Sequence, residues 1–488
     1  MDKIKEKVQE LIDNHFVLLS LGLFILLSFA LFFNLWLNPV HDFDEARHGV
    51  NAYEMIQERN WIANYYNGDV DYYNLKPPLS YWMISLCYLI FGYHPFALRF
   101  YSAFFSLVGN VVLYFYVKHK YGKTSALISV LAFLGCINLF AYHGVRSGDA
   151  DGLFIFLFIL GYTSLGRSSE KPQWIYLTGL SFALMFLAKS FHSFIFIPIV
   201  FFYLLFTKGF KNIGWWRLIL FFLCSLLPIF LWGIARYSFD GWAFISRMFT
   251  FDLLQRTSEA GFEGHESTIF YYLRAFVFNP PLLISLVLSV IYLIWKIKKR
   301  EPLSNEAKLV LISSLSIFGF FSLSKTRLDW YVDIGYIPLI VALSVLIRKF
   351  LNEILVDRPG LIKTRKVLAV CLPSIMTISA LISSSIGFIT PMVNKMDEVH
   401  QLLLNSDIQN GALIYLSEEY HHKPTQSYLI TMEFAFDGRM KIASLEEFES
   451  DDISNSYYLS SKASLPIDYE SVYQVINSTD TCTIIQKK

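Results

Sequence analysis

Long apolar runs recur along this chain of 488 residues and limit its fold more than any other feature. A helix needs about 20 mostly apolar residues to satisfy its backbone amides inside a bilayer. Charged residues make up only 17% of the sequence, whereas soluble domains carry about 25%. We therefore predict an all-α polytopic membrane protein. Its eleven expected spans are residues 15–37, 100–117, 124–143, 152–165, 173–188, 190–207, 218–235, 280–295, 309–324, 331–347 and 367–390.

The charge balance and the cysteines exclude several classes of protein. The 41 basic and 40 acidic side chains nearly cancel, so the chain offers no polybasic surface for nucleic acid. The five cysteines are scattered singly, and no pair is spaced for zinc or for a short disulfide loop. A nucleic-acid partner is excluded, and redox or structural-metal roles have little support.

The distribution of lysine and arginine predicts the orientation. The first apolar run is too long for a signal peptide, so we interpret it as a permanent span. The run from Pro77 to Gly92 has only 16 residues, and we expect it to lie along the membrane surface. On that assignment the cytoplasmic segments hold 22 Lys and Arg in 69 residues, and the outer loops hold 12 in 121. Because positive residues collect on the cytoplasmic side, we expect a cytoplasmic (inner) membrane protein with a cytoplasmic N-terminus.

Two domains are expected. Residues 1–390 form a transmembrane domain with outer loops at 38–99 and 236–279, and residues 391–488 form a small extracytoplasmic α/β domain. In the second domain MDEVHQLLLN indicates a short helix, while GALIYL and QSYLITMEF alternate with turn residues, as strands do.

The first outer loop concentrates carboxylates next to the first expected span. The motif HDFDEARHG carries Asp42, Asp44 and Glu45. Crowded carboxylates raise one another's pKa, so that one of them becomes a usable base near neutral pH. The alternative is structural: Asp42 or Asp44 caps a helix that begins near Ala46 and runs through Gln57. Neighbouring carboxylates can serve both purposes.

Basic residues accompany these acids on the same predicted face. Lys76 directly precedes two prolines, which extend the chain and fix the direction of its ammonium group. Lys189 lies at a tight turn between the fifth and sixth spans, and Arg256 and Lys325 lie on later outer loops. Taken singly, each matches a basic anchor at the membrane interface.

The second outer loop reads RSGDAD and places Arg146, Asp149 and Asp151 at the mouth of two spans. Charges there are costly unless they are paired or functional, and an ion pair between Arg146 and Asp151 is the structural alternative. Cations around a cavity at membrane level suit a lipid phosphate, and a nearby carboxylate suits deprotonation of a hydroxyl. Together these residues predict group transfer from a lipid phosphate to an alcohol.

A divalent metal is a further candidate partner of the carboxylates. Asp44, Glu45, His48 and the distant His265 carry suitable donor atoms, although their spacing matches no recognised metal motif and an interfacial histidine satisfied by hydrogen bonds is the alternative. No glycine-rich phosphate loop follows a strand, which argues against a cytoplasmic nucleotide-sugar site.

Two other functions fit a chain with many spans. A lipid or sugar transporter is the main alternative, but the chain has no evident inverted repeat and its unusual charges cluster at one face rather than at the midplane. A membrane scaffold whose outer domain binds a partner is the other. Release of lipid phosphate from a polyprenyl-phosphate sugar would distinguish an enzyme from both.

The loop sequences DEARHG and NYYNGDVDYYNLKPPLSYW resemble those of the bacterial protein O-mannosyltransferases and aminoarabinose lipid A transferases of the glycosyltransferase C superfamily. RSGDAD, LAKSFHSFIFIP and FSLSKTRLDWYV resemble further motifs of that family in the same order, over about residues 40–340. The resemblance implies an inverting integral membrane glycosyltransferase. Its donor would be a polyprenyl-phosphate sugar, and its acceptor lipid A, a protein or a surface glycan on the outer face.

The resemblance also implies roles for individual residues. By motif position, Asp44 activates the acceptor with Glu45 beside it, and Asp151 is the second acid of the active-site mouth. The residues implied to bind the donor phosphate are Lys76, Arg256 and Lys189. The further candidates are Arg146, Asp149, His265 and Lys325. Two departures bear on the acceptor side: Ser190 and Phe191 replace the usual Gly-Pro, and Asp329 stands where the family often has proline.

Overall fold

The computed structural model describes residues 2–37, 39–141, 143–255, 268, 270–350, 362–393, 396–420 and 425–488. The chain divides into two compact units. Residues 1–33, 75–79 and 102–387 form the helical unit, and residues 34–74, 80–101 and 388–488 form the mixed unit. The mixed unit therefore joins the first predicted outer loop to the C-terminal residues.

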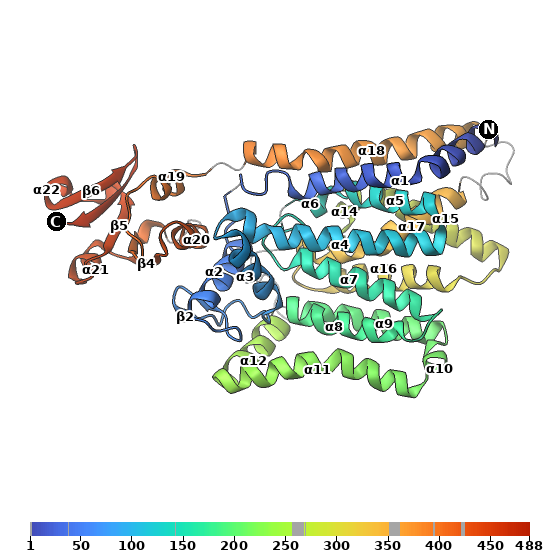
Figure 1. Ribbon diagram of the computed structural model, residues 1–488, viewed down its shortest axis with the longest axis horizontal. Helices are drawn as coiled ribbons and strands as arrows, with labels where there is room; N and C mark the ends of the chain where they lie inside the picture. The colour runs from blue at the N-terminus through green and yellow to red at the C-terminus, as the bar shows by residue number, and fades with distance from the viewer. Residues whose placement is uncertain are drawn as a thin grey trace. The chain divides into compact units, whose positions relative to one another are not determined.

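The long helices of the helical unit have roughly aligned axes (Figure 1). Its α-helices are α1 (Asp2–Phe32), α4 (Pro95–Tyr121), α5 (Lys123–Leu134), α6 (Ile137–Phe140), α7 (Asp151–Ser168), α8 (Trp174–Lys189), α9 (Phe196–Phe206), α10 (Gly209–Ile213), α11 (Trp215–Asp240), α12 (Ala243–Arg247), α14 (Leu273–Phe278), α15 (Pro280–Lys299), α16 (Asn305–Leu323), α17 (Tyr336–Lys349) and α18 (Ile362–Val393). Its 3-10 and π-helical segments are η1 (Ser190–Ile195), η2 (Met248–Gln255) and η4 (Asp329–Gly335).

Eight helical segments in the described part of the chain are long and apolar enough to cross a membrane. They overlap nine of the eleven predicted spans, because Trp174–Phe206 covers most of two of them. The other two predicted spans correspond to the shorter α5 and to α7. Side chains such as Phe222, Phe230 and Leu231 on α11 are more than half exposed, as expected where a helix faces lipid.

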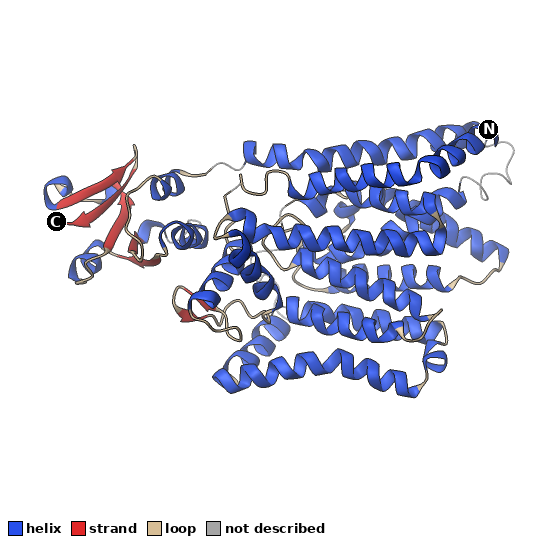
Figure 2. Cartoon of the chain, viewed as in Figure 1, coloured by secondary structure: helices blue, strands red, loops and turns tan. Residues whose placement is uncertain are grey.

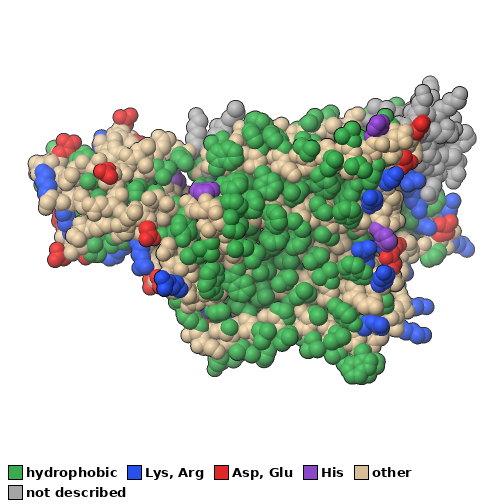
Figure 3. Space-filling view, in the orientation of Figure 1, with side chains coloured by type: hydrophobic (Ala, Val, Ile, Leu, Met, Phe, Trp, Pro, Cys, Tyr) green, Lys and Arg blue, Asp and Glu red, His purple; other side chains and the backbone are tan. Residues whose placement is uncertain are grey.

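Contacts between helix ends show how the helical unit is threaded. Ser20 of α1 and Tyr114 of α4 share a hydrogen bond of 2.7 Å, and Lys123 at the start of α5 pairs with Asp13 of α1 at 3.0 Å. Helices α1 and α4 are therefore antiparallel, and the segment between them begins and ends at the same end of the unit. Lys and Arg side chains gather at the opposite end of the unit (Figure 3), the end at which Figure 1 marks the N-terminus. This arrangement agrees with the expectation that the run containing α3 (Leu79–Phe91) does not cross.

The mixed unit contains a five-stranded sheet with strand order β4-β3-β5-β7-β6, drawn in red in Figure 2. Strand β3 is parallel to both β4 and β5, and the remaining pairs are antiparallel. The strands are β1 (Tyr65–Tyr66), β2 (Asp69–Val70), β3 (Leu413–Ser417), β4 (Arg439–Ala443), β5 (Ser456–Ser461), β6 (Tyr473–Ser478) and β7 (Cys482–Lys487). The helices are α2 (Asp44–Gln57), α3, α19 (Glu398–Leu404), η7 (Glu418–Tyr420), α20 (Thr425–Phe436), α21 (Leu445–Ser450), η8 (Lys462–Ser464) and α22 (Tyr469–Val472).

The predictions for the C-terminal residues are confirmed in part. GALIYL contains strand β3, and MDEVHQLLLN contains helix α19. The prediction of a strand for QSYLITMEF is wrong, because these residues belong to helix α20. The buried residues of α20 are consecutive and do not follow the alternating pattern of a strand. The helix packs on α2 and on β4, and these contacts bury most of its surface. Tertiary packing thus overrides the strand preference of its β-branched and aromatic residues.

Candidate active site

The carboxylates of the first outer loop lie where helix α2 begins. Asp44 is its first residue and is partly exposed, and the helix ends at Gln57 as predicted. The N-cap is Phe43, whose φ of 63° is unusual for a residue with a side chain and whose side chain makes no capping hydrogen bond. The predicted cap by Asp42 or Asp44 is therefore wrong. Asp42 instead accepts a hydrogen bond of 2.9 Å from the backbone of Ser427, in the first turn of α20.

Glu45 is fully buried and forms a two-pronged ion pair with Arg99. The guanidinium donates to the two carboxylate oxygens at 2.7 and 2.8 Å, and the backbone N–H of His41 donates to one of them at 2.8 Å. Arg99 also donates to the carbonyls of Leu35 and Pro39, both at 2.8 Å. Burial alone would raise the pKa of Glu45, but the Arg99 charge and its hydrogen bonds lower that pKa to about 2. Glu45 is thus ionised. Through its contacts with Arg99 and His41 it holds residues 35–41 against the first turn of α2.

A second ion pair holds the opposite side of α2. Arg47 donates to Asp71 at 2.8 and 2.9 Å, and the same carboxylate accepts a hydrogen bond from Asn51 at 3.0 Å. The Arg47 guanidinium also lies 4.1 Å from the ring centre of Tyr66 and 4.6 Å from that of Tyr73. These contacts bind the tyrosine-rich part of the loop to the helix that begins at Asp44. His48 completes the first turn through a contact of 2.7 Å between its Nδ1 and the carbonyl oxygen of Asp44.

In the helical unit, Arg146 does not pair with Asp151. Its guanidinium is buried and donates to the carbonyl oxygens of Ala30, Leu31 and Phe33 at the C-terminal end of α1. The last carbonyls of a helix form the negative end of its dipole, so a guanidinium group is favourable there. The structural alternative of an ion pair with Asp151 is therefore wrong, and Arg146 fixes the point at which the chain leaves α1.

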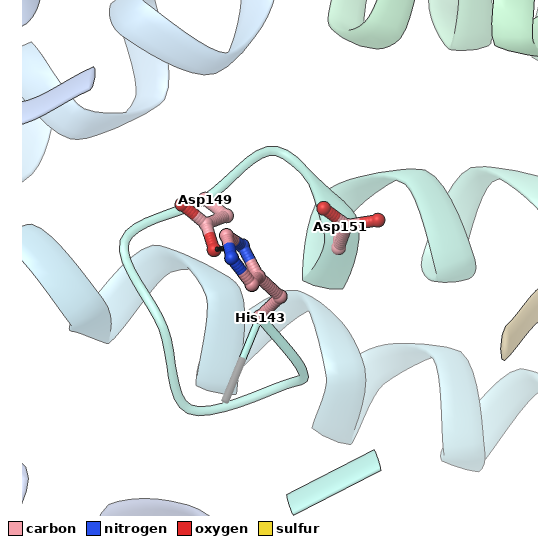
Figure 4. Close-up of side chains that lie close together, drawn as sticks. All are labelled: His143, Asp149 and Asp151. Carbon is pink, nitrogen blue, oxygen red and sulfur yellow. Dashed lines mark ion pairs between the residues drawn. The ribbon is translucent and has the colours of Figure 1, made fainter. Parts of the chain in front are cut away.

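Asp151 is paired with Lys189 instead. Asp151 is the first residue of α7, Lys189 is the last residue of α8, and both are buried in their ion pair. Close to them, Nδ1 of His143 lies 2.5 Å from a carboxylate oxygen of Asp149, and Figure 4 shows these two side chains facing each other across the loop before α7.

The ligand atoms of His143, Asp149 and Asp151 lie within 4.8 Å of one another. Among the described residues they are the set that could hold a divalent ion. The set suggested by the sequence is different: Glu45 is held by Arg99 and Nδ1 of His48 contacts a carbonyl oxygen, while His265 lies outside the described residues.

A buried acid that the motifs did not single out completes this cluster. Asp333 lies in η4 with 3% of its surface exposed, and it interacts electrostatically with Asp151 and Lys189. The signal available in the sequence was an aspartate inside the apolar run that follows FSLSKTRLDWYV. Nearby, the ring of His143 stacks on Trp330 with centroids 3.8 Å apart.

The remaining candidates are distributed as follows. Lys76 is partly exposed and belongs to the helical unit, and Lys325 is exposed after the end of α16. Arg256 lies outside the residues that the structure describes. Ser190, which replaces the family's glycine, has φ of 52° and ψ of −135°, a backbone conformation that favours glycine. The departure from the motif is therefore accommodated with backbone strain at the turn after Lys189.

Comparisons with known proteins agree with this architecture. The family model for dolichyl-phosphate-mannose-protein mannosyltransferases matches residues 75–240. A protein of Aquifex aeolicus described only as uncharacterized is 30% identical, over 68% of this chain and 74% of the relative. An undecaprenyl phosphate-alpha-4-amino-4-deoxy-L-arabinose arabinosyl transferase of Wigglesworthia glossinidia brevipalpis is 28% identical, over 74% of this chain. The chain spans 64% of the length of that transferase.

Solved structures show the same fold. ArnT from Cupriavidus metallidurans bound to undecaprenyl phosphate superposes with a TM-score of 0.69, covering 96% of this chain and 97% of that chain at 14% identity. The apo oligosaccharyltransferase of Archaeoglobus fulgidus gives a TM-score of 0.53 at 10% identity, covering 90% of this chain and 69% of that chain.

The fold class and the family resemblance inferred from the loop motifs are confirmed, and a transporter is not favoured. The chain has the fold of these membrane proteins and is 30% identical to a relative over 74% of that relative's length. It therefore belongs to the glycosyltransferase C superfamily of integral membrane glycosyltransferases, in the group of the bacterial mannosyl and aminoarabinose transferases.

Proposed function

We propose that this protein transfers a sugar from a polyprenyl-phosphate donor to a hydroxyl or phosphate group of a lipid acceptor, on the outer face of the cytoplasmic membrane and with inversion. The observation that carries this proposal is the contrast between two neighbouring carboxylates. Glu45 is buried and neutralised by Arg99, whereas Asp44 is partly exposed on the helix that this ion pair holds in place.

The reaction needs a base for the acceptor and cations for the leaving phosphate. The Asp44 carboxylate would take the proton of the acceptor hydroxyl while the hydroxyl oxygen bonds to the anomeric carbon of the sugar. The bond from that carbon to the phosphate oxygen breaks, and the electron pair leaves with the lipid phosphate. A single displacement from the opposite side inverts the configuration. Because a lipid phosphate is a good leaving group once its charge is held, a strong general acid is unnecessary.

Lys76 is the residue we assign to the donor phosphate, together with Arg256. Lys189 was assigned there by motif position, but its ammonium is buried against Asp151. We therefore propose that Lys189 and Asp151 act as a positioning pair that fixes the ends of α7 and α8. Removal of either partner alone would leave a buried charge uncompensated, which is strongly destabilising.

The test of the base is Asp44→Asn in the purified protein, supplied with a polyprenyl-phosphate sugar and an acceptor lipid. We expect released lipid phosphate to fall at least a hundredfold while donor binding persists, since a general base contributes about 10² to 10⁴ in rate. Asp69→Asn, at an exposed position in β2, is the matched control and should keep its activity. Turnover of the Asp44 variant at the wild-type rate would remove that residue from the mechanism.

The test of the phosphate contact is Lys76→Ala. Loss of a charge-assisted hydrogen bond should raise the donor concentration needed for half-maximal rate by about tenfold or more, with a smaller effect on the maximal rate. Lys171→Ala, an exposed lysine between α7 and α8, should leave both quantities unchanged. An equal loss in both variants would contradict the assignment.

The acceptor and the orientation have their own tests. Mass spectrometry of envelope lipids and glycoproteins, from cells with and without the gene, should show the sugar on a lipid rather than on a protein. A reporter fused after residue 488 should be active outside the cytoplasm if the mixed unit faces outward. A sugar found only on proteins would redirect the acceptor assignment while leaving the donor chemistry intact.

A further inference from the structure

A buried polar network in the mixed unit joins the C-terminal residues to the loop that precedes Asp44. Nδ1 of His400 lies 2.8 Å from a carboxylate oxygen of Asp397, and Nε2 of His400 lies 2.9 Å from the hydroxyl oxygen of Ser427. The Ser427 hydroxyl donates to the carbonyl oxygen of Val40 at 2.6 Å. The Ser427 backbone N–H donates to Asp42 at 2.9 Å.

Counting protons fixes the state of the histidine. A serine hydroxyl has one proton, and Val40 can only accept it because a carbonyl is not a donor. The Ser427 oxygen must therefore accept from Nε2 of His400. Burial would raise the pKa of Asp397, but hydrogen bonds from His400 and Tyr428 lower it to about 2, so its carboxylate is ionised and accepts from Nδ1. Both ring nitrogens then carry protons, and the network is complete only with a charged imidazolium.

The same three residues have the order of a serine hydrolase triad, but their geometry excludes that role. A nucleophilic serine donates its proton to the histidine, whereas Ser427 donates to Val40. Ser427 is also 2% exposed, which leaves no path for a substrate. The network is therefore structural.

The contacts of Asp42 connect this network to the start of α2. The Asp42 carboxylate accepts from backbone groups in the first turn of α20, including the N–H groups of Gln426 and Ser427. It thus caps α20, a helix of 12 residues, from another part of the chain. Asp42 is two residues before Asp44, so a loop held at Asp42 also restricts the position of Asp44.

We propose that Asp397, His400 and Ser427 form a latch that holds residues 40–42, and through them the base Asp44, only while His400 carries both ring protons. This proposal rests on the proposed function, because it assigns positioning residues for that reaction. The charged and titratable groups that face His400 are Asp397 on its own helix, Asp42 from the loop, and Tyr428 on α20, whose ring centroid lies 4.7 Å from the imidazole.

The sign of the pH dependence follows directly. The latch is closed at acidic pH, where the imidazole is doubly protonated, and it opens as the pH rises and Nε2 loses its proton. A neutral Nε2 offers Ser427 only a lone pair, and the serine then has one proton for two acceptors, Val40 and His400.

The experiment compares the wild-type full chain with His400→Phe, which keeps the ring contact with Tyr428 and removes both donors. The ratio of wild-type to variant kcat is measured from pH 6 to pH 9 with a polyprenyl-phosphate sugar. We expect a ratio of about ten at pH 6 that falls to about one at pH 9. His119→Phe, at an exposed position near the end of α4, is the control and should give a ratio near one throughout.

Ser427→Ala provides a second test, since it removes the hydroxyl but leaves the backbone N–H that binds Asp42. It should reproduce the pH-dependent ratio of His400→Phe. Hydrogen exchange of the Gln426 and Ser427 amides provides a readout that needs no activity. After correction for intrinsic exchange, wild-type protection should fall about tenfold between pH 6 and pH 9, and the protection in His400→Phe should not depend on pH.

The outcomes separate the latch from the proposed function. A large ratio that is the same at every pH would overturn the latch, because a purely structural histidine gives that result. A ratio near one at every pH would also overturn it. If the wild-type protein transfers no sugar at any pH, the proposed function fails, and the exchange measurement still decides whether the latch exists.

Discussion

The ion pair between Arg99 and Glu45 gives the sharpest prediction for the start of α2. Arg99→Met removes the guanidinium but keeps an unbranched side chain of similar length. Glu45 then remains buried with 0% of its side chain exposed, and its negative charge has lost its partner. We expect the local stability of α2 to fall, because an uncompensated buried charge costs about 3 to 5 kcal/mol.

The magnitude can also be worked from the pKa of Glu45. The ordinary value is 4.5 and the folded value is about 2, so the difference corresponds to about 3 kcal/mol at neutral pH. Because the folded pKa is the lower one, this stability is present above pH 4.5 and is lost as the pH falls toward 2. The two estimates agree, and they predict a loss of amide protection by roughly two orders of magnitude in the variant.

Hydrogen exchange of the peptide covering residues 44–57 is the assay, since it reports the opening of this helix alone. Lys441→Met is the control, because Lys441 and Glu447 form an exposed ion pair whose loss should cost less than about 1 kcal/mol. The variant Arg99→Met should also lack the loss of protection that the wild type shows below pH 4.5. Equal and small effects of the two substitutions would refute the reasoning.

Three further predictions follow from the site and the mixed unit. Ser190→Gly should stabilise the protein against thermal unfolding by about 1 kcal/mol, because it relieves the positive φ, whereas Ser193→Gly in η1 should destabilise it; the opposite order would exclude strain at this turn. Burial and the neighbouring Glu54 raise the pKa of Glu433 well above its ordinary value. The folded protein therefore loses stability as the pH rises and this buried carboxyl group is forced to ionise. Glu433→Gln should therefore raise the unfolding temperature at pH 8 but not at pH 4, and the exposed control Glu446→Gln should change neither. Incubation with a chelator should leave transfer within about twofold of its initial rate, since Lys189 already neutralises one carboxylate of the cluster; a complete loss that zinc or manganese restores would assign a metal.

The sequence predicted the elements of this protein better than their pairings. Apolar runs of sufficient length identify membrane helices because the bilayer imposes one physical requirement on each segment separately. A helix from near Ala46 to Gln57 was predicted in the same way, from local residues, and α2 begins two residues earlier. The partner of a charged side chain is not a local property, and Asp151 illustrates this. The sequence suggested Arg146, five residues away, as one possible partner, yet Lys189, 38 positions away, is the observed one.

The same limit explains the buried residues that were missed. Arg99 follows a proline and several aromatic residues, and nothing in that context indicates that it reaches Glu45, which is 54 positions earlier. Asp333 lies in a run whose composition predicts only a span. The helix α20 shows the converse, because its β-branched and aromatic residues predict a strand until their packing on α2 is known. The roles of Asp44 and Lys76 stay predictions that only activity measurements will test.

The contact between Ser427 and Asp42 has a consequence for biogenesis, because it joins residues that are 385 positions apart. The ribosome makes Asp42 long before Ser427 exists, so a nascent chain must insert almost all of its helices before helix α2 can gain its last supports. An unfinished or prematurely terminated polypeptide would then carry the proposed base without the scaffold that aims it. Such a chain would be inert toward lipid-linked sugars, and only a completed one would be competent.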